Sequence, residues 1–301
     1  MSVEADEGTR RTIALAAPLD VVRTTEPLRH GPHDPSCRVV DGVVWRAWRS
    51  PAGPATIRLV THPDRVEATA WGEGADAALD AAPNLIGSTD DDSGFRPAHG
   101  PVADLWNRFP GLRITRTGSV TEALIAHVLE QRVTPFEAHR AHQQVAERWG
   151  DPAPGPMGLL LPPDPQRLAG ASHYELHLAG VEQDRGDLVR RLAASARRLD
   201  ALALLPPAAA HQRLREVAGV GAWAAARVAM TALGDADAVP VGDPRLAADV
   251  TFALTGTATD DDEALLAALE PWAGHRARVV RLVAVGGLHA PAHGPRYAPT
   301  T

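Results

Sequence analysis

The first third of the chain alternates short apolar runs with polar turns, a pattern typical of β-strands. Residues 39–48 hold the pair Asp41-Gly42 between two apolar runs, and this pair predicts a tight hairpin turn. The pattern then continues with two predicted strands and a short predicted helix, at residues 55–60, 65–71 and 74–82. This part of the chain is therefore expected to form a β-rich unit.

From residue 101 onward, apolar residues recur at helical spacing. The longest stretch, residues 121–150, follows a candidate capping box with Ser119 as N-cap and Glu122 three residues later. The pair Thr134-Pro135 predicts a break into two helices. Further helices are predicted over residues 165–169, 172–179, 185–203, 208–217, 222–233, 244–254, 262–269 and 275–285.

These patterns predict an α+β protein with a β-rich N-terminal domain followed by a mainly α-helical region. Four segments follow from them: a disordered N-terminus at residues 1–12, the β-rich domain at 13–100, the helical region at 101–285 and an irregular tail at 286–301.

Composition narrows the class of protein. With 45% apolar and 22% charged residues, the chain resembles a soluble globular protein, and no apolar run approaches the roughly 18 residues of a membrane span. The single cysteine, Cys37, excludes an internal disulfide and a four-cysteine iron–sulfur cluster. The acidic N-terminus lacks the pattern of a signal peptide, so we expect a cytoplasmic protein. We also expect it to be a monomer that needs no cofactor and does not contact a membrane.

The charge of the chain is uneven. The net charge of −7 argues against a strongly basic nucleic-acid binder. Residues 1–110 hold 11 arginines and 16 acids, whereas residues 111–301 hold 19 arginines and 21 acids, so a DNA-binding face is expected in the second part. All 30 basic residues are arginines. Because the chain has no lysine, chemistry through a lysine Schiff base is excluded.

A tight turn, Gly219-Val220-Gly221, lies between two predicted helices. Paired glycines allow backbone N–H groups to approach a phosphate closely at the positive end of a helix. Such contacts do not depend on base sequence. The alternative interpretation is an ordinary packing corner between two helices.

Asp243 follows Gly221 by 22 residues and precedes Pro244, which suits an N-cap with proline at the first helical position. Capping alone explains this residue. A carboxylate at a helix N-terminus is also held in a field that favours its ionised form. Such a group can stabilise the oxocarbenium-like cation that forms when a base leaves its sugar, or it can activate water.

The hairpin and Asp243 together resemble the helix–hairpin–helix DNA glycosylases, most closely the 3-methyladenine DNA glycosylase II (AlkA-type) group. Residues 125–134, Ile-Ala-His-Val-Leu-Glu-Gln-Arg-Val-Thr, are similar to that group's I-L-x-Q-x-V-S/T helix. Residues 270–276 resemble its P-W-R turn, and the β-rich part matches its small antiparallel sheet domain. The resemblance covers most of residues 13–285.

The resemblance implies a role for each matching residue. Asp243 is the implied catalytic carboxylate, and Trp223 and Gln131 are implied to line the pocket for the flipped base. The DNA backbone would be bound by the turn residues Gly219, Val220, Gly221 and Ala222. A structural Na⁺ or K⁺ would be held by the carbonyls of Val217, Gly219 and Ala222, and the partner would be double-stranded DNA with damaged bases.

Three positions depart from the family pattern. Arg132 stands where the group places a leucine wedge, which fills the gap left by the flipped base. Arg227 stands at the position of a pocket tyrosine, and Arg281 near that of a second pocket tryptophan. Another aromatic, such as Trp272 or Tyr297, is an alternative wall for the pocket.

The leading hypothesis is a monofunctional DNA glycosylase of base excision repair that releases alkylated purines and leaves an abasic site. Two alternatives use the same fold: a glycosylase with shifted lesion specificity and a non-catalytic DNA-damage-binding protein. A helical protein without a nucleic-acid role is a further alternative, based on the acidic charge.

Overall fold

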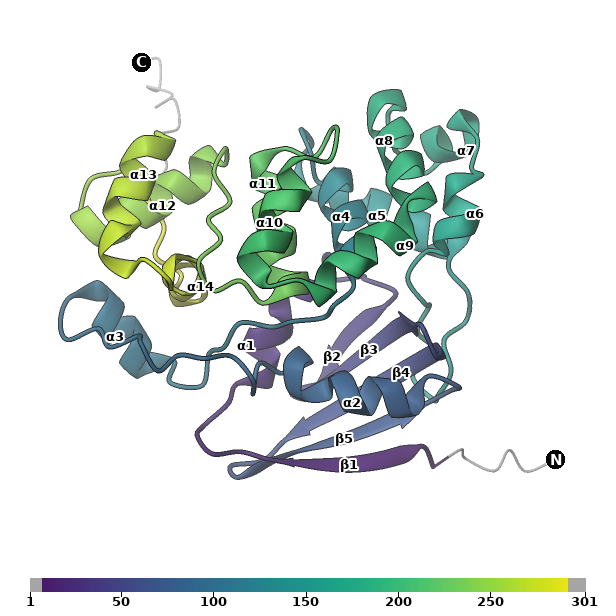
Figure 1. Ribbon diagram of the computed structural model, residues 1–301, viewed down its shortest axis with the longest axis horizontal. Coiled ribbons are helices and arrows are strands. Elements are labelled where there is room, and N and C mark those ends of the chain that lie inside the picture. Colours follow the sequence, from purple (N-terminus) through teal and green to yellow (C-terminus); the bar gives the residue numbers. More distant parts are fainter. Residues whose placement is uncertain (1–6, 292–301) are drawn as a thin grey trace, which may run out of the picture.

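The computed structural model describes residues 7–291 and begins with a five-stranded antiparallel sheet (Figure 1). Its strand order is β1-β5-β4-β3-β2. The strands are β1 (Thr9–Ala14), β2 (Cys37–Val40), β3 (Val43–Ser50), β4 (Gly53–Thr61) and β5 (Arg65–Trp71). Apart from β1, the strands lie in the sheet in chain order as a simple meander.

The hairpin between β2 and β3 forms at the predicted pair. Asp41 and Gly42 have φ values of 50° and 76°, and Val40 pairs with Val43 across the turn. Positive φ at both central residues is the geometry that an Asp-Gly pair favours. The prediction of a disordered segment is wrong for residues 9–12, because they pair with β5 within strand β1. Residues 1–6 lie outside the described part.

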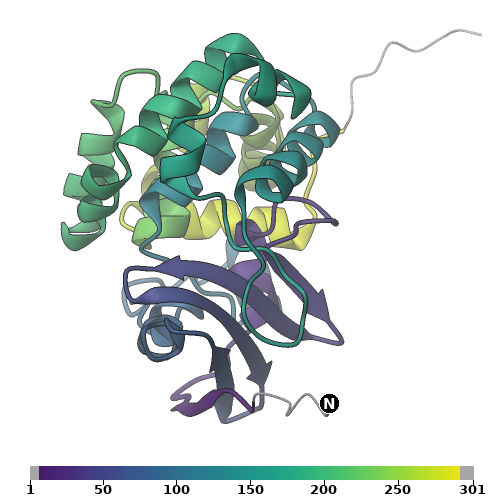
Figure 2. The same ribbon diagram turned by 90° about the vertical axis from the view of Figure 1, so that its right-hand side faces the viewer.

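The two faces of the sheet are covered by different elements. Val44 and Trp48 of β3 pack toward α2 (Ala75–Leu85), whereas Trp45 and Ala47, one residue out of phase, face the loop near Leu159. This follows from the two-residue period of a strand. Figure 2 shows the loop crossing the sheet below the helical region.

The helical part forms two hydrophobic cores. In Figure 1 the helices of the first lie above the sheet, and those of the second lie to the left of them. The first core gathers the helices from α4 to α11, and the second gathers α3 and α12 to α14. The shorter connecting helices are α1 (Val21–Thr25), η1 (Glu26–Leu28), η2 (Ala201–Leu204), η3 (Ala229–Leu233) and η4 (Glu270–Trp272). The main helices are α3 (Pro101–Arg108), α4 (Val120–Leu129), α5 (Pro135–Trp149), α6 (Pro165–Ala169), α7 (His173–Leu178), α8 (Gln183–Ala194), α9 (Ala196–Asp200), α10 (Pro207–Arg215), α11 (Ala222–Val228), α12 (Pro244–Thr255), α13 (Asp262–Leu269) and α14 (Arg276–Gly286).

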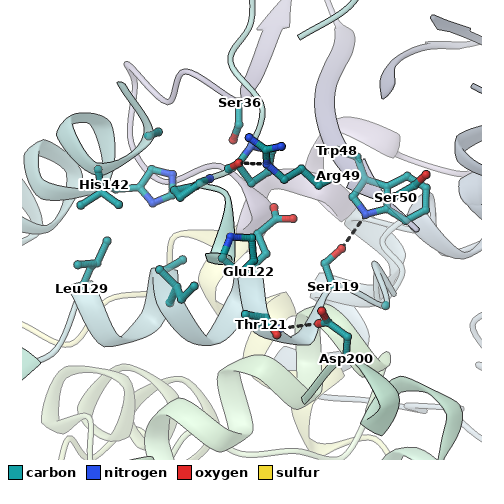
Figure 3. A pocket seen from close by; sticks show the side chains of 18 of the residues that line it. Ser36, Trp48, Arg49, Ser50, Ser119, Thr121, Glu122, Leu129, His142 and Asp200 are labelled. Carbon is teal, nitrogen blue, oxygen red and sulfur yellow. Dashed lines mark hydrogen bonds between the residues drawn. The ribbon is translucent and has the colours of Figure 1, made fainter. Parts of the chain in front are cut away.

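The predicted capping box of α4 does not form. Ser119 is the N-cap, but its hydroxyl accepts a hydrogen bond from Trp48 Nε1 at 2.9 Å, and Glu122 pairs with Arg46 of β3. Asp200 takes over the cap by accepting the backbone N–H of Thr121 at 2.8 Å (Figure 3). Contacts with the sheet and with α9 therefore replace the local interaction that the sequence pattern favours.

The single helix predicted over residues 185–203 is also wrong, because the chain turns at Ser195 between α8 and α9. This turn brings Asp200 to the start of α4. Figure 3 shows the cavity of about 290 Å³ that remains between β3, α4 and α5. Several polar groups at its edge, including Trp48, Ser119 and Asp200, make the hydrogen bonds that join the sheet to the helices.

No helix among the described residues is both long and apolar enough to cross a membrane. After α14 ends at Gly286, residues 287–291 form neither helix nor strand, as predicted for the tail. The rest of the predicted tail, residues 292–301, lies outside the described part.

Candidate functional site

Three segments that are distant in sequence meet at a cavity of about 530 Å³ between the two helical cores. They are the α4–α5 turn, the α10–α11 hairpin and the start of α12. The cavity is lined by Glu130, Gln131, Arg132, Val133, Gly219, Gly221, Trp223, Ala224, Gly242, Asp243 and Pro244. It thus brings together six of the residues singled out in the sequence: Gln131, Arg132, Gly219, Gly221, Trp223 and Asp243.

The hairpin is closed by a hydrogen bond from the backbone N–H of Val220 to the carbonyl of Val217 at 2.9 Å. Gly219 has a φ of 88°, and a Cβ atom there would lie 2.9 Å from Cδ1 of Leu188. The side chain of Val220 is buried in the first helical core, so only its backbone is available to a ligand. The fold itself therefore requires glycine at position 219.

Gly221 differs from Gly219 in this respect. Its φ of −76° suits any residue, and a Cβ atom there would meet nothing within 4 Å. It is exposed and forms the N-cap of α11. The described structure therefore requires glycine here neither for space nor for its backbone conformation.

Asp243 is the N-cap of α12. Its Oδ1 accepts the backbone N–H groups of Arg245 at 3.0 Å and Leu246 at 3.1 Å. Its Oδ2 makes no hydrogen bond to any described residue. One carboxyl oxygen therefore fixes the side chain, and the other remains free at the cavity. Gly242 precedes it with a φ of 91°, and a Cβ atom added there would lie 4.0 Å from the Cβ atom of Trp223.

Trp223 is the one aromatic residue among those that line the cavity. Its ring meets the ring of His127 edge-on at 5.8 Å, and the Arg227 guanidinium lies 5.9 Å from its centre. Arg227 is not a lining residue, and its Nε is buried without a hydrogen-bond partner in the described structure. Arg227 therefore supports Trp223 from beside the cavity.

Two other candidate pocket positions, Arg281 and Trp272, lie away from the cavity. Arg281 is buried and joins α14 to the N-terminal part. Its guanidinium donates a hydrogen bond to the carbonyl of Arg23 at 2.8 Å and pairs with the carboxylate of Glu26 at 3.3 Å. Trp272 packs against Phe95 in the second helical core, with ring centres 5.6 Å apart. Tyr297 lies outside the described residues.

Arg132 occupies the turn between α4 and α5 with an unusual backbone. Its φ is 55°, a left-handed conformation that a residue with a Cβ atom seldom adopts. The turn is held on its far side by a capping box, in which Thr134 and Glu137 each satisfy the other's backbone N–H. The Arg132 side chain is exposed at the edge of the cavity.

Sequence reasoning missed a largely buried cluster of histidines and acids that borders the cavity through Glu130. The two oxygens of Glu130 contact different imidazoles: Oε1 lies 3.1 Å from Nδ1 of His30, and Oε2 lies 3.0 Å from Nδ1 of His127. The rings of His30 and His142 are tilted by 40° with their centres 4.5 Å apart, and His142 Nε2 lies 3.7 Å from Asp34 Oδ1. Only the i,i+3 spacing of His127 and Glu130 was visible in the sequence, because His30 and Asp34 come from the N-terminal part.

These contacts set the protonation of the cluster. Burial would raise the pKa of Glu130, but the charge interactions and hydrogen bonds with His127 and His30 hold this pKa well below its usual range. Burial lowers the pKa of His127 to about 4, despite the opposing effect of Glu130. The pKa of His30, which burial would lower, is raised by its hydrogen bond to Glu130. No group of three His, Cys, Asp or Glu residues within 7–291 is arranged to hold a metal ion.

The buried His127 predicts a dependence of stability on pH. Its folded-state pKa lies below the value of about 6.5 in an unfolded chain, so the unfolded state binds the proton first as the pH falls. We expect His127 to remove about 3 kcal/mol of stability between pH 7 and pH 4. The variant His127→Asn keeps a donor toward Glu130 but cannot titrate. Urea unfolding should show a wild-type advantage at pH 7 that shrinks toward pH 4, and parallel pH curves for the two proteins would contradict the assignment.

No family model matches the sequence. The chain is similar to two curated proteins from strains of Mycobacterium tuberculosis, each described as a probable bifunctional transcriptional activator/DNA repair enzyme AlkA. Each is 30% identical over 220 residues, which cover 69% of this chain and 44% of the relative. The chain therefore matches less than half of the length of these relatives.

Solved structures show the fold more completely. A 3-methyladenine DNA glycosylase from Archaeoglobus fulgidus has a TM-score of 0.77, with 18% identity, over 91% of this chain and 97% of that chain. The apo form of the 8-oxoguanine glycosylase/lyase of Clostridium acetobutylicum has a TM-score of 0.70, with 10% identity, over 93% of this chain and 98% of that chain. The chain therefore has the fold of these DNA glycosylases. The curated proteins to which its sequence is similar are described as AlkA DNA repair enzymes.

Proposed function

We propose that the chain is a DNA glycosylase of base excision repair, which binds double-stranded DNA, takes a damaged base into the cavity beside Trp223 and hydrolyses its glycosidic bond. The observation that carries this proposal is the meeting of Gly221, Trp223 and Asp243 at one cavity. A backbone-binding turn, an aromatic wall and a carboxylate are the parts that base flipping and hydrolysis need.

The proposed chemistry depends on the two oxygens of Asp243. Oδ1 is fixed by two backbone N–H groups, so the carboxylate needs little rearrangement during the reaction. Oδ2 is free to stabilise the positive charge that develops on the sugar as the base leaves, or to accept a proton from the attacking water. The abasic sugar and the free base are the products.

The hairpin is the proposed contact with the DNA backbone. Backbone N–H groups at the start of α11 bind phosphate without reading the bases, which suits an enzyme that must search many sequences. The Arg191 guanidinium would lie 3.3 Å from a Cβ atom at Gly219, so a positive charge borders the turn. A Na⁺ or K⁺ at the carbonyls of Val217, Gly219 and Ala222 stays a prediction, and the Val217 carbonyl already accepts one hydrogen bond.

We further propose that the enzyme is monofunctional and acts on alkylated purines. Lyase chemistry through a Schiff base needs a side-chain amine, and this chain contains no lysine. At the start of α11 the residues after Trp223 are the buried Ala224 and Ala225. An electron-poor alkylated purine would stack favourably on the Trp223 ring.

The function is tested with a panel of duplexes that each carry one modified base: 7-methylguanine, 1,N⁶-ethenoadenine, hypoxanthine or 8-oxoguanine. Alkali cleavage after incubation reveals abasic sites, and strand breaks without alkali reveal a lyase. Release of 7-methylguanine without such breaks is expected. Tight binding to a damaged duplex with no release from any of them would favour the non-catalytic damage-binding alternative, which the single aromatic wall of the cavity also suggests.

Arg132 is the proposed wedge that fills the gap in the duplex. The variant Arg132→Gly should be as stable as the wild type or more stable by about 0.5–1 kcal/mol, because glycine relieves the left-handed backbone. Its rate of base release should nevertheless fall about tenfold, because the flipped state loses a side chain that holds the gap open. The matched variant Arg132→Ala should lose the same activity but gain no stability. Thermal unfolding and single-turnover release measure both effects, and unchanged release in both variants would remove the wedge role.

A further inference from the structure

Glu130 is a second acid at the cavity that the proposed mechanism does not use. Its side chain is 22% exposed and lines the same space as Trp223 and Asp243. Each of its oxygens already contacts one imidazole, from His30 and from His127. Since a carboxylate has about four lone-pair sites, each oxygen keeps one free acceptor position. Glu130 is therefore both firmly oriented and available to a ligand.

The two imidazoles come from different parts of the fold. His127 lies on α4 and is 1% exposed, whereas His30 lies in the N-terminal part and is 14% exposed. His127 also meets the ring of Trp223. The acid is thus fixed relative to the aromatic wall, which is an arrangement that can recognise a particular edge of a flat ligand.

The charge of the cavity gives a second, independent argument. Two acids, Glu130 and Asp243, line it, against a single basic residue, Arg132, which is exposed at the edge. An acidic cavity is unfavourable for a protein that must approach polyanionic DNA, unless the ligand carries a compensating positive charge. In the proposed mechanism, Asp243 stabilises the positive charge that develops on the sugar. Glu130 is therefore available to interact with a positive charge on the base.

We propose that Glu130 is the specificity-determining residue of the cavity, and that it selects bases with a formal positive charge and an N–H edge over neutral bases of the same shape. This inference rests on the proposed function for its substrate. The hydrogen bonds from His30 and His127 orient the carboxylate, Trp223 stacks on the base, and Glu130 accepts its N–H groups. A neutral damaged base gains the stacking but not the charge interaction.

The test compares a cationic base with a neutral one in two measurements. One is the ratio of kcat/KM for 7-methylguanine and hypoxanthine duplexes. The other is the ratio of Kd for duplexes with 2′-fluoro-7-methylguanosine and 2′-fluoroguanosine, whose fluorine resists cleavage of the glycosidic bond. In Glu130→Gln, both ratios should fall about tenfold, since the amide keeps the shape and loses the charge. Glu130→Asp, which keeps the charge, should stay within about threefold of the wild type.

Glu122→Gln is the matched control. Glu122 lies on the same helix and is paired with Arg46, but it does not line this cavity, so the ratios should not change. Equal losses on cationic and neutral bases in Glu130→Gln, or no change in either ratio, would overturn the inference and leave a merely structural role. If the wild type releases no base but its Kd ratio depends on Glu130, the hydrolytic function is wrong and the recognition of cations stands.

Discussion

Replacement of Asp243 by asparagine is expected to lower base release by about 10²–10⁴-fold. Asparagine is nearly as good an N-cap as aspartate, so the hydrogen bonds to Arg245 and Leu246 can persist and α12 should keep its start. The variant loses only the negative charge and the basic oxygen at the cavity. Affinity for damaged duplexes should remain within a few-fold of the wild type. Single-turnover release and equilibrium binding measure the two effects separately.

Asp243→Ala separates catalysis from capping. It removes both the charge and the cap, so it should lose the same activity and about 1 kcal/mol of stability as well. If Asp243→Asn kept full activity while Asp243→Ala was destabilised, Asp243 would be a cap and no more. The catalytic carboxylate would then have to be sought elsewhere.

Replacement of Gly221 by alanine is expected to weaken DNA binding about tenfold or more, with a loss of stability within roughly 1 kcal/mol. The added Cβ atom meets open space within the protein and fits the backbone, so the fold should tolerate it apart from a slightly poorer N-cap. It would instead occupy the space that a phosphate needs beside the backbone N–H groups. Fluorescence anisotropy with a labelled duplex, at several salt concentrations, measures the loss.

Gly219→Ala is the contrasting variant at the same turn. There the φ of 88° and the contact of 2.9 Å with Leu188 predict a loss of about 1–3 kcal/mol in the free energy of unfolding. The hairpin assignment predicts that the variant at 219 is mainly a stability mutant and the variant at 221 mainly a binding mutant. Normal DNA affinity in a folded Gly221→Ala protein would exclude this turn from the interface.

Local patterns predicted most elements correctly where the deciding interactions were also local. The Asp41-Gly42 hairpin formed because both residues tolerate positive φ, and α4 and α5 separated because of Pro135. The errors arose where distant segments intervened. The capping box at Ser119 and Glu122 gave way to contacts with Trp48 and Arg46 of β3.

For the site, the same division holds. The glycine spacing of the hairpin, the Asp243-Pro244 pair and the absence of lysine are properties of the sequence. The proposals of a phosphate-binding turn and of hydrolysis without lyase chemistry rest on them. The sequence could not show that Gly219 serves the fold while Gly221 stays open, because that depends on Leu188 of another helix. Nor could it show Glu130 between His30 and His127, since those histidines lie 97 residues apart in the chain. The sequence alone determines which residue types stand next to each other in the hairpin and at Asp243. Tertiary packing brings distant residues within a few ångströms of one another, and it decides how exposed each cavity residue is, which charges surround it and which hydrogen bonds it makes.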